Sequence, residues 1–198
     1  MQRPHKEWYS RGYLPHFDHP GLVQMLTFRL ADALPPEIVA ELARSNKNET
    51  NAKKRRRVEA HLDAGFGSCF LRDRSIASLV QGALLHFDME RYQLFAWVVM
   101  PNHVHALLEI FEEFLLCEVL QSWKSFTSKE ANRILVKSGQ FWEPEYFDRF
   151  IRNSRHFDCA VRYIHENPVR AGLVSTPEEW EFSSARYLKS HRSWEIVR

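Results

Sequence analysis

The chain has 198 residues, 44% of them hydrophobic, with 27 Lys and Arg against 25 Asp and Glu, so one packed domain of net charge +2 is expected. The near-balanced charge gives no sign of a nucleic-acid-binding surface, no apolar run reaches the ~18–20 residues of a membrane span, and the amino terminus lacks a secretory signal. The three cysteines, Cys69, Cys117 and Cys159, are far apart, which argues against a disulfide framework or a zinc knuckle. We therefore expect a cytoplasmic location.

The first third of the chain predicts one strand and a helical stretch. Residues 1–21 are rich in aromatic residues, His and Pro and end in a turn. Residues 22–30 (LVQMLTFRL) contain β-formers in near alternation and predict a strand. A helix is expected from about residue 34 to 64, although the polar stretch 45–51 could break it.

The middle of the chain predicts a helix and two adjacent strands. Asp73 can cap a helix that reaches about Met89, because apolar residues recur every three or four positions after it. Residues 92–100 and 103–110 are strand-like and are joined by the Pro101-Asn102 turn. This arrangement favours a hairpin.

The last third of the chain predicts two helices with a short strand between them. Residues 112–138 are expected to be helical, 141–151 to include a short strand, and 155–166 to form a helix that stops near Pro168. Residues 175–198 form a tail that we expect to be only partly ordered. The order of elements, with two adjacent strands, predicts a single domain over 1–198 with an α+β sandwich, one antiparallel sheet and helices on one face.

Two histidines in the second of the adjacent strands are candidates for metal binding. His103 and His105 flank Val104, and in a strand this spacing puts both imidazoles on one face. Two imidazoles on one face can ligate a single metal ion. For this short pattern alone, a pair of buried core histidines is an equal alternative.

A tyrosine in the last helix is a candidate nucleophile. Tyr163 and Asn167 are four residues apart, so they are neighbours if the helix extends that far. A tyrosine beside an amide oxygen can act as a nucleophile next to a metal ligand. In isolation, the simpler interpretation is an interfacial tyrosine whose hydroxyl meets solvent.

These two motifs together resemble a known family. Residues 97–105 (WVVMPNHVH) and 163–172 (YIHENPVRAG) resemble the single-tyrosine HUH transposases, and above all the REP-associated tyrosine transposases of bacteria. The resemblance covers about residues 10 to 185, and further segments match in the family's order: 11–18 (RGYLPHFD), 27–30 (TFRL), 122–127 (SWKSFT) and 146–152 (YFDRFIR).

The resemblance implies a fold and a site. The expected topology is ferredoxin-like or RRM-like, with the histidine pair on a middle strand of a central antiparallel sheet. His103 and His105 would be metal ligands, Tyr163 the nucleophile, and Asn167 the third ligand, a role that Glu166 or His165 could take instead. The cofactor would be a divalent ion, Mg²⁺ or Mn²⁺.

The resemblance also implies an activity. Family members cleave and rejoin single-stranded DNA that carries hairpins, through a 5′-phosphotyrosine intermediate. A domesticated hairpin-binding protein without catalysis and a replication initiator or relaxase are the alternatives. The partner would be hairpin-forming repetitive palindromic DNA, and the protein would be cytoplasmic and nucleoid-associated, as a monomer or a homodimer.

The candidate DNA contacts come from three parts of the sequence: the amino-terminal segment, the helix after the histidine strand, and the surroundings of the tyrosine helix. Phosphates need positive charges, and unpaired bases need aromatic faces. For any single Lys or Arg among them, a solvated surface position is the simpler interpretation, and the group is better supported than its members. The candidates are Arg11, Tyr13, His16, Lys124, Lys129, Arg133, Arg149, Arg152 and Arg170.

Overall fold

The computed structural model describes residues 7–10, 15–44 and 51–188. In chain order its elements are β1 (Glu7–Ser10), β2 (Pro15–Asp18), β3 (Val23–Leu30), α1 (Pro36–Arg44), α2 (Asn51–Asp63), α3 (Arg74–His86), β4 (Tyr92–Val99), β5 (His103–Ile110), α4 (Leu116–Ile134), β6 (Trp142–Phe150) and α5 (Ser154–Arg170). Three short 3₁₀ helices lie at Phe70–Arg72, Pro177–Glu179 and Ser184–Tyr187.

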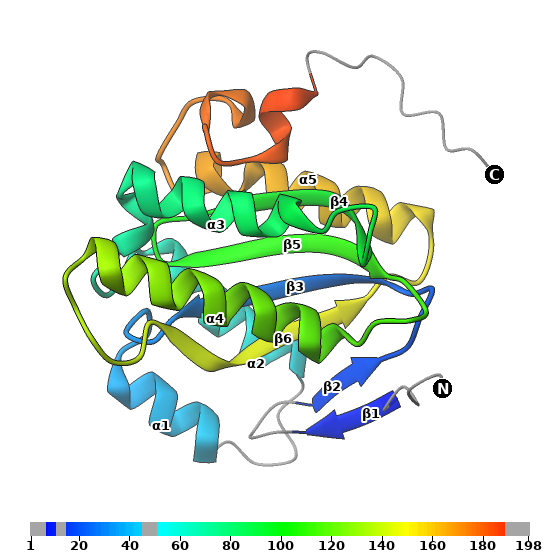
Figure 1. Cartoon of the computed structure of the whole chain (residues 1–198), viewed down its shortest axis with the longest axis horizontal. Coiled ribbons are helices and arrows are strands. Elements are labelled where there is room, and N and C mark those ends of the chain that lie inside the picture. Colours follow the sequence, from blue (N-terminus) through cyan, green and yellow to red (C-terminus); the bar gives the residue numbers. More distant parts are fainter. Residues whose placement is uncertain (1–6, 11–14, 45–50, 189–198) are drawn as a thin grey trace.

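The centre of the protein is a four-stranded antiparallel sheet in the order β4-β5-β3-β6 (Figure 1). The hairpin of β1 and β2 forms a separate two-stranded sheet. The histidine strand β5 is therefore an inner strand, with β4 and β3 as its neighbours. The predicted α+β sandwich with a central antiparallel sheet that carries the histidine pair is confirmed.

The two faces of the sheet are covered by different helices. Helices α3 and α4 lie in front of the sheet in Figure 1, and their apolar side chains pack on Phe28 and Val104. Helix α5 lies behind the sheet, where Ala160 and Ile164 pack on Leu107. The expectation of helices on one face is therefore correct for α3 and α4 and wrong for α5. The apolar spacing of a helix gives it a buried side, but it does not tell which face of the sheet that side meets.

Helix α5 is longer than expected and includes Pro168. Its N-terminus is capped by the side chain of Asn153, which accepts a hydrogen bond from the backbone N–H of His156 at 2.9 Å. We expected the helix to stop before Pro168, because the residue before a proline avoids the α region. That expectation is wrong: the buried Pro168 lies in the last turn, and the backbone N–H of Ala171 donates to the Asn167 carbonyl at 3.0 Å. Asn167 is therefore helical.

Other predicted boundaries agree to within a few residues. Asp73 caps α3, with its carboxylate accepting from the backbone N–H of Ser75 at 2.8 Å. The helix expected over residues 34–64 is two helices, α1 and α2, and the segment between them lies outside the described residues. The short strand expected within 141–151 is the nine-residue edge strand β6. Within the described ranges, no helix is long and apolar enough to cross a lipid bilayer.

Candidate active site

The side chains of His103 and His105 lie together on the α5 face of the sheet. Both are completely buried. Their Nε2 atoms are 3.2 Å apart, and the ring planes are inclined at 78°. The two imidazoles therefore present their Nε2 atoms to a common point, as the i, i+2 spacing predicts for a strand.

The opposite ring nitrogens are held by two polar side chains. His103 Nδ1 is hydrogen-bonded to Asn102 Oδ1 at 2.8 Å, and His105 Nδ1 to the hydroxyl of Thr27 at 2.7 Å. Thr27 is the cross-strand partner of His105 on β3. Such outer contacts fix the orientation of metal-ligating histidines.

Asn167 contacts the histidine pair from α5. Its Nδ2 atom is 3.4 Å from His105 Nε2, and its Oδ1 atom is buried without a hydrogen-bond partner among the described residues. A half-turn of the side-chain amide would exchange the two atoms and place Oδ1, in place of Nδ2, towards His105 Nε2. Of the two other candidate third ligands, His165 is bonded to Ser184 at 2.8 Å and Glu166 is exposed.

Tyr163 lies one helical turn before Asn167. Its ring centroid is 5.3 Å from that of His105, and its hydroxyl is buried. The guanidinium of Arg170 lies 5.1 Å from the centre of the tyrosine ring. The four site residues predicted by the two motifs therefore meet at one place.

The surroundings of Tyr163 favour its neutral form. Burial raises the pKa of this phenol, and the carboxylates of Glu59 and Asp63 on α2 raise it further, whereas Arg170 lowers it. Burial also raises the pKa of Asp63. Reaction through the phenolate therefore needs a positive charge that stabilises it.

The histidine pair is neutral at physiological pH. Burial lowers the pKa of His103 to about 3. Burial, followed by the influence of His103 and Arg170, lowers the pKa of His105 well below its usual value. Neutral imidazoles are the form that binds metals.

The donor set fits one divalent cation. Among the described residues, no group of three His, Cys, Asp or Glu side chains could hold a metal ion. The two facing Nε2 atoms and the unpartnered Oδ1 of Asn167 supply two imidazole donors and one amide oxygen instead. Mn²⁺ accepts imidazole more readily than Mg²⁺, which prefers oxygen, and either ion would keep open positions.

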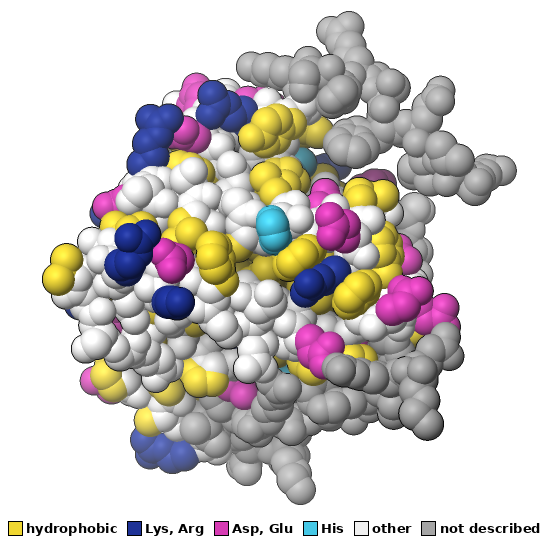
Figure 2. Space-filling view, in the orientation of Figure 1, with side chains coloured by type: hydrophobic (Ala, Val, Ile, Leu, Met, Phe, Trp, Pro, Cys, Tyr) yellow, Lys and Arg dark blue, Asp and Glu magenta, His cyan; other side chains and the backbone are white. Residues whose placement is uncertain are grey.

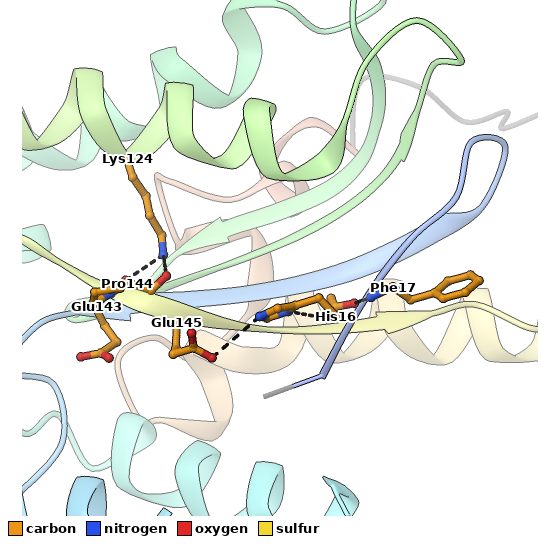
Figure 3. Close-up of polar contacts among 7 residues, drawn as sticks. His16, Phe17, Lys124, Glu143, Pro144 and Glu145 are labelled. Carbon is orange, nitrogen blue, oxygen red and sulfur yellow. Dashed lines mark hydrogen bonds and ion pairs between the residues drawn. The ribbon is translucent and has the colours of Figure 1, made fainter. Parts of the chain in front are cut away.

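The basic residues of α4 are not near this site. Lys124, Lys129 and Arg133 belong to a helix on the opposite face of the sheet. The ammonium group of Lys124 donates to the backbone carbonyls of Glu143 and Pro144 on β6, at 2.7 and 3.1 Å (Figure 3). Arg133 forms an ion pair on its own helix. On the face that shows α3 and α4, Lys and Arg side chains are interspersed with acidic and hydrophobic ones (Figure 2).

Three arginines lie on or near the α5 face. Arg149 is opposite Met25, on the same side of the sheet as the histidine pair, and its guanidinium is 3.8 Å from the Met25 sulfur. Arg152 is exposed just before α5, and Arg170 is exposed at its end. These three are the predicted DNA contacts that the fold places on the side of Tyr163. Arg11 and the Tyr13 side chain lie outside the described residues.

His16 is completely buried and attaches the amino-terminal hairpin to β6. Its Nδ1 atom bonds Asp148 at 2.7 Å, and its ring stacks on Tyr146 with the ring centroids 4.0 Å apart. Its Nε2 atom is 3.8 Å from Glu145 (Figure 3). The backbone N–H of Phe17 donates to the same Asp148 carboxylate at 2.9 Å. These contacts point inward, so His16 positions the hairpin.

We expect His16→Ala to lower the free energy of unfolding by about 2–4 kcal/mol, because it removes a buried hydrogen bond to Asp148, a charge contact with Glu145 and a stacked ring. Urea denaturation measures this change. The exposed Lys129→Ala is the control and should stay within about 0.5 kcal/mol of the parent. Unchanged stability together with weaker binding of hairpin DNA would instead make His16 a direct DNA contact.

Sequence reasoning missed four residues of this site: Thr27, Asn102, Glu59 and Asp63. Thr27 is 78 positions from His105, and no local pattern links the two. Asn102 was assigned only to a turn. The two acidic residues lie on α2, which the sequence predicts only as part of a helical stretch. The pairing of β3 with β5 brings Thr27 to the site, and the docking of α2 brings the two acidic residues.

Comparisons with known proteins agree with this geometry. Residues 74–167, which include the histidine pair, Tyr163 and Asn167, match the family model described as "Transposase IS200 like". The REP-associated tyrosine transposase of Escherichia coli (strain K12) is 26% identical over 107 residues, which are 54% of this chain and 62% of that protein. A provisionally assigned REP-associated tyrosine transposase of Haemophilus influenzae (strain ATCC 51907 / DSM 11121 / KW20 / Rd) is 22% identical over 103 residues, 47% of this chain and 58% of that protein.

The matched segment spans about three fifths of the length of each curated relative. A solved structure of a REP-associated tyrosine transposase bound to a REP hairpin shares the fold, with a TM-score of 0.58 at 19% identity over 92% of this chain and 85% of that one. The resemblance predicted from the sequence motifs is therefore confirmed.

Proposed function

Since the chain contains an IS200-like transposase segment, we propose that it is a metal-dependent single-stranded DNA endonuclease and strand-transferase that acts on hairpin-forming repetitive palindromic DNA. The observation that carries this proposal is the meeting of Tyr163 and Asn167 of α5 with the histidine pair of β5. The REP hairpin bound to the structural relative supports the choice of DNA.

In this proposal His103, His105 and Asn167 hold a divalent ion. When bound, the ion polarises the scissile phosphodiester and offsets the negative charge that develops during the reaction. The two imidazoles contribute neutral Nε2 donors, and the amide contributes its oxygen after a half-turn. The burial of all three side chains keeps competing water away from these donors.

The tyrosine hydroxyl attacks the scissile phosphorus. The Oη–P bond forms, the bond from phosphorus to the 3′ oxygen breaks, the phenol proton passes to solvent, and the departing oxygen takes up a proton. The product is a 5′-phosphotyrosine and a free 3′ hydroxyl, and attack by a 3′ hydroxyl reverses the step without ATP. Arg170 lies beside the tyrosine ring and favours the phenolate.

The DNA strand is held by positive charges on the tyrosine side of the sheet. Arg149, Arg152 and Arg170 are the phosphate contacts that this geometry favours, since Arg149 lies on the α5 face of the sheet and the other two lie just before α5 and at its end. Each such contact would add to the salt dependence of binding. Arg11 and Tyr13 remain candidate contacts from the amino-terminal segment.

A labelled single-stranded oligonucleotide that carries a hairpin and a flanking tail tests the proposed function. We expect cleavage with Mn²⁺ or Mg²⁺, a covalent protein–DNA adduct that survives denaturing electrophoresis, and no adduct in EDTA. A fully duplex oligonucleotide of the same sequence is the control and should stay intact. Tight hairpin binding without cleavage under any divalent ion would contradict the enzymatic function and favour a DNA-binding role.

A further inference from the structure

We propose that Asn102 is a positioning residue that holds His103 in the tautomer with its proton on Nδ1, so that Nε2 is always available to a cation. This inference rests on the proposed metal-binding role of the histidine pair. Asn102 has no contact with DNA or metal in this role. It acts only through the imidazole of His103.

The tautomer follows from a chain of two hydrogen bonds that starts at a backbone carbonyl. Asn102 Nδ2 donates to the carbonyl oxygen of Phe66 at 2.9 Å. A carbonyl can only accept, so the NH₂ group of the amide must face Phe66 and its oxygen must face His103. Asn102 Oδ1 is 2.8 Å from His103 Nδ1, and an amide oxygen also only accepts. His103 Nδ1 therefore carries the proton.

The asparagine is held rigidly in this position. Its side chain is completely buried, so water does not compete for either bond. Its backbone carbonyl accepts from the N–H of Leu30 at 2.9 Å, and the carbonyl of Pro101 accepts from the N–H of Leu71 at 3.1 Å. The turn between β4 and β5 is thereby tied to the end of β3 and to a 3₁₀ helix. Reversing the amide would set two acceptors, Asn102 Oδ1 and the Phe66 carbonyl, against each other.

His105 is held differently. Its partner at Nδ1 is the hydroxyl of Thr27, which can donate or accept and therefore selects no tautomer. The two Nε2 atoms are within hydrogen-bond distance at 3.2 Å, and His103 Nε2 can only accept. When the Asn167 amide takes its half-turned orientation, with Oδ1 towards His105, the Nε2 atom of His105 can carry the proton in the metal-free protein and donate it to His103. For His105 Nε2 to serve as a cation ligand, the proton would have to lie on Nδ1 instead, where the Thr27 oxygen can accept it.

Nitrogen-15 NMR of the imidazoles in metal-free, isotope-labelled protein reads both tautomers directly. We expect an Nδ1-protonated His103 in the parent protein, and an Nε2-protonated His105 when the Asn167 amide takes its half-turned orientation. In Asn102→Leu, His103 should become a mixture of tautomers, and the affinity for Mn²⁺, measured by electron paramagnetic resonance, should fall about 10–100-fold. The matched control Thr27→Val should leave the tautomer of His103 unchanged.

Asn102→Asp keeps an acceptor beside His103 and serves as the conservative variant, which is also informative if the leucine variant does not fold. It should retain the Nδ1 proton on His103 and bind Mn²⁺ more tightly than Asn102→Leu. An Nε2-protonated His103 in the parent, or an unchanged tautomer in Asn102→Leu, would overturn the inference. A correct tautomer in a parent protein that binds no Mn²⁺ would contradict the proposed function and leave the hydrogen-bond chain intact.

Discussion

Tyr163→Phe is expected to abolish the covalent protein–DNA adduct and to reduce strand cleavage by about 10⁴-fold or more. The phenyl ring keeps the shape of the side chain and lacks the oxygen that attacks phosphorus. Single-turnover cleavage of a hairpin oligonucleotide in Mn²⁺ measures the rate, and denaturing electrophoresis detects the adduct. Undiminished cleavage by this variant would move the nucleophile to another residue.

The same substitution should hardly change the fold. The ring contact with His105 survives in phenylalanine, and the hydroxyl that is removed is a buried group beside the carboxylates of Glu59 and Asp63. We therefore expect the free energy of unfolding to change by less than about 1 kcal/mol. Tyr187→Phe, at an exposed tyrosine beside Trp97, is the matched control and should cleave at the parent rate. A loss of several kcal/mol in Tyr163→Phe would instead show a structural role for its hydroxyl.

The protein should lose stability steeply as the pH falls from about 6.5 towards 4. Burial lowers the pKa of His103 to about 3 and that of His165 to about 4, from an unfolded value of 6.5. In this pH window the unfolded chain binds protons that the folded chain does not, so acid favours unfolding. For each pH unit by which the pH falls in this window, each of these histidines is expected to lower the free energy of unfolding by about 1.4 kcal/mol. Above about pH 6.5 these histidines are neutral in both the folded and the unfolded chain, so the stability is at its full value there.

Urea denaturation at a series of pH values, in EDTA, measures this slope without a contribution from metal binding. His165→Gln should flatten the slope by about one proton, since it removes one titrating group while an amide can still bond Ser184. His86→Gln, at an exposed histidine, is the control and should keep the parent slope. A parent-like slope in His165→Gln would mean that His165 titrates normally in the folded protein.

The sequence predicted the parts of the fold that depend on local periodicity. Near alternation of β-forming residues marked β3, two strand-like apolar runs marked β4 and β5, and the cap at Asp73 placed the start of α3. The end of α5 was predicted wrongly, because a preference of the residue before Pro168 was weighed without the tertiary contacts of the last turn. The local periodicity of α5 also could not predict which face of the sheet the helix packs on. This choice depends on which face of the sheet the other helices leave uncovered.

The candidate site shows the same division. The i, i+2 pair in β5 and the i, i+4 pair in α5 are local patterns, and each put two functional side chains on one surface. Thr27 reaches His105 only through strand pairing. The charge of Lys124 suggested a phosphate contact, but composition cannot distinguish an ammonium group in solvent from one that donates to the carbonyls of β6. Such roles are set by tertiary packing.

Helix α5 also determines how this site can move. Tyr163 and Asn167 are four residues apart on one helix, about 6 Å along its axis, and the histidines belong to the sheet. Ala160 and Ile164 form the apolar contact between helix and sheet, and this contact lies on the same stretch of the helix. A rigid shift of α5 along the sheet therefore moves Tyr163, the proposed nucleophile, and the amide of Asn167 together. The alignment of Tyr163 and Asn167 with the histidine pair therefore depends on the position of one helix on one face of the sheet.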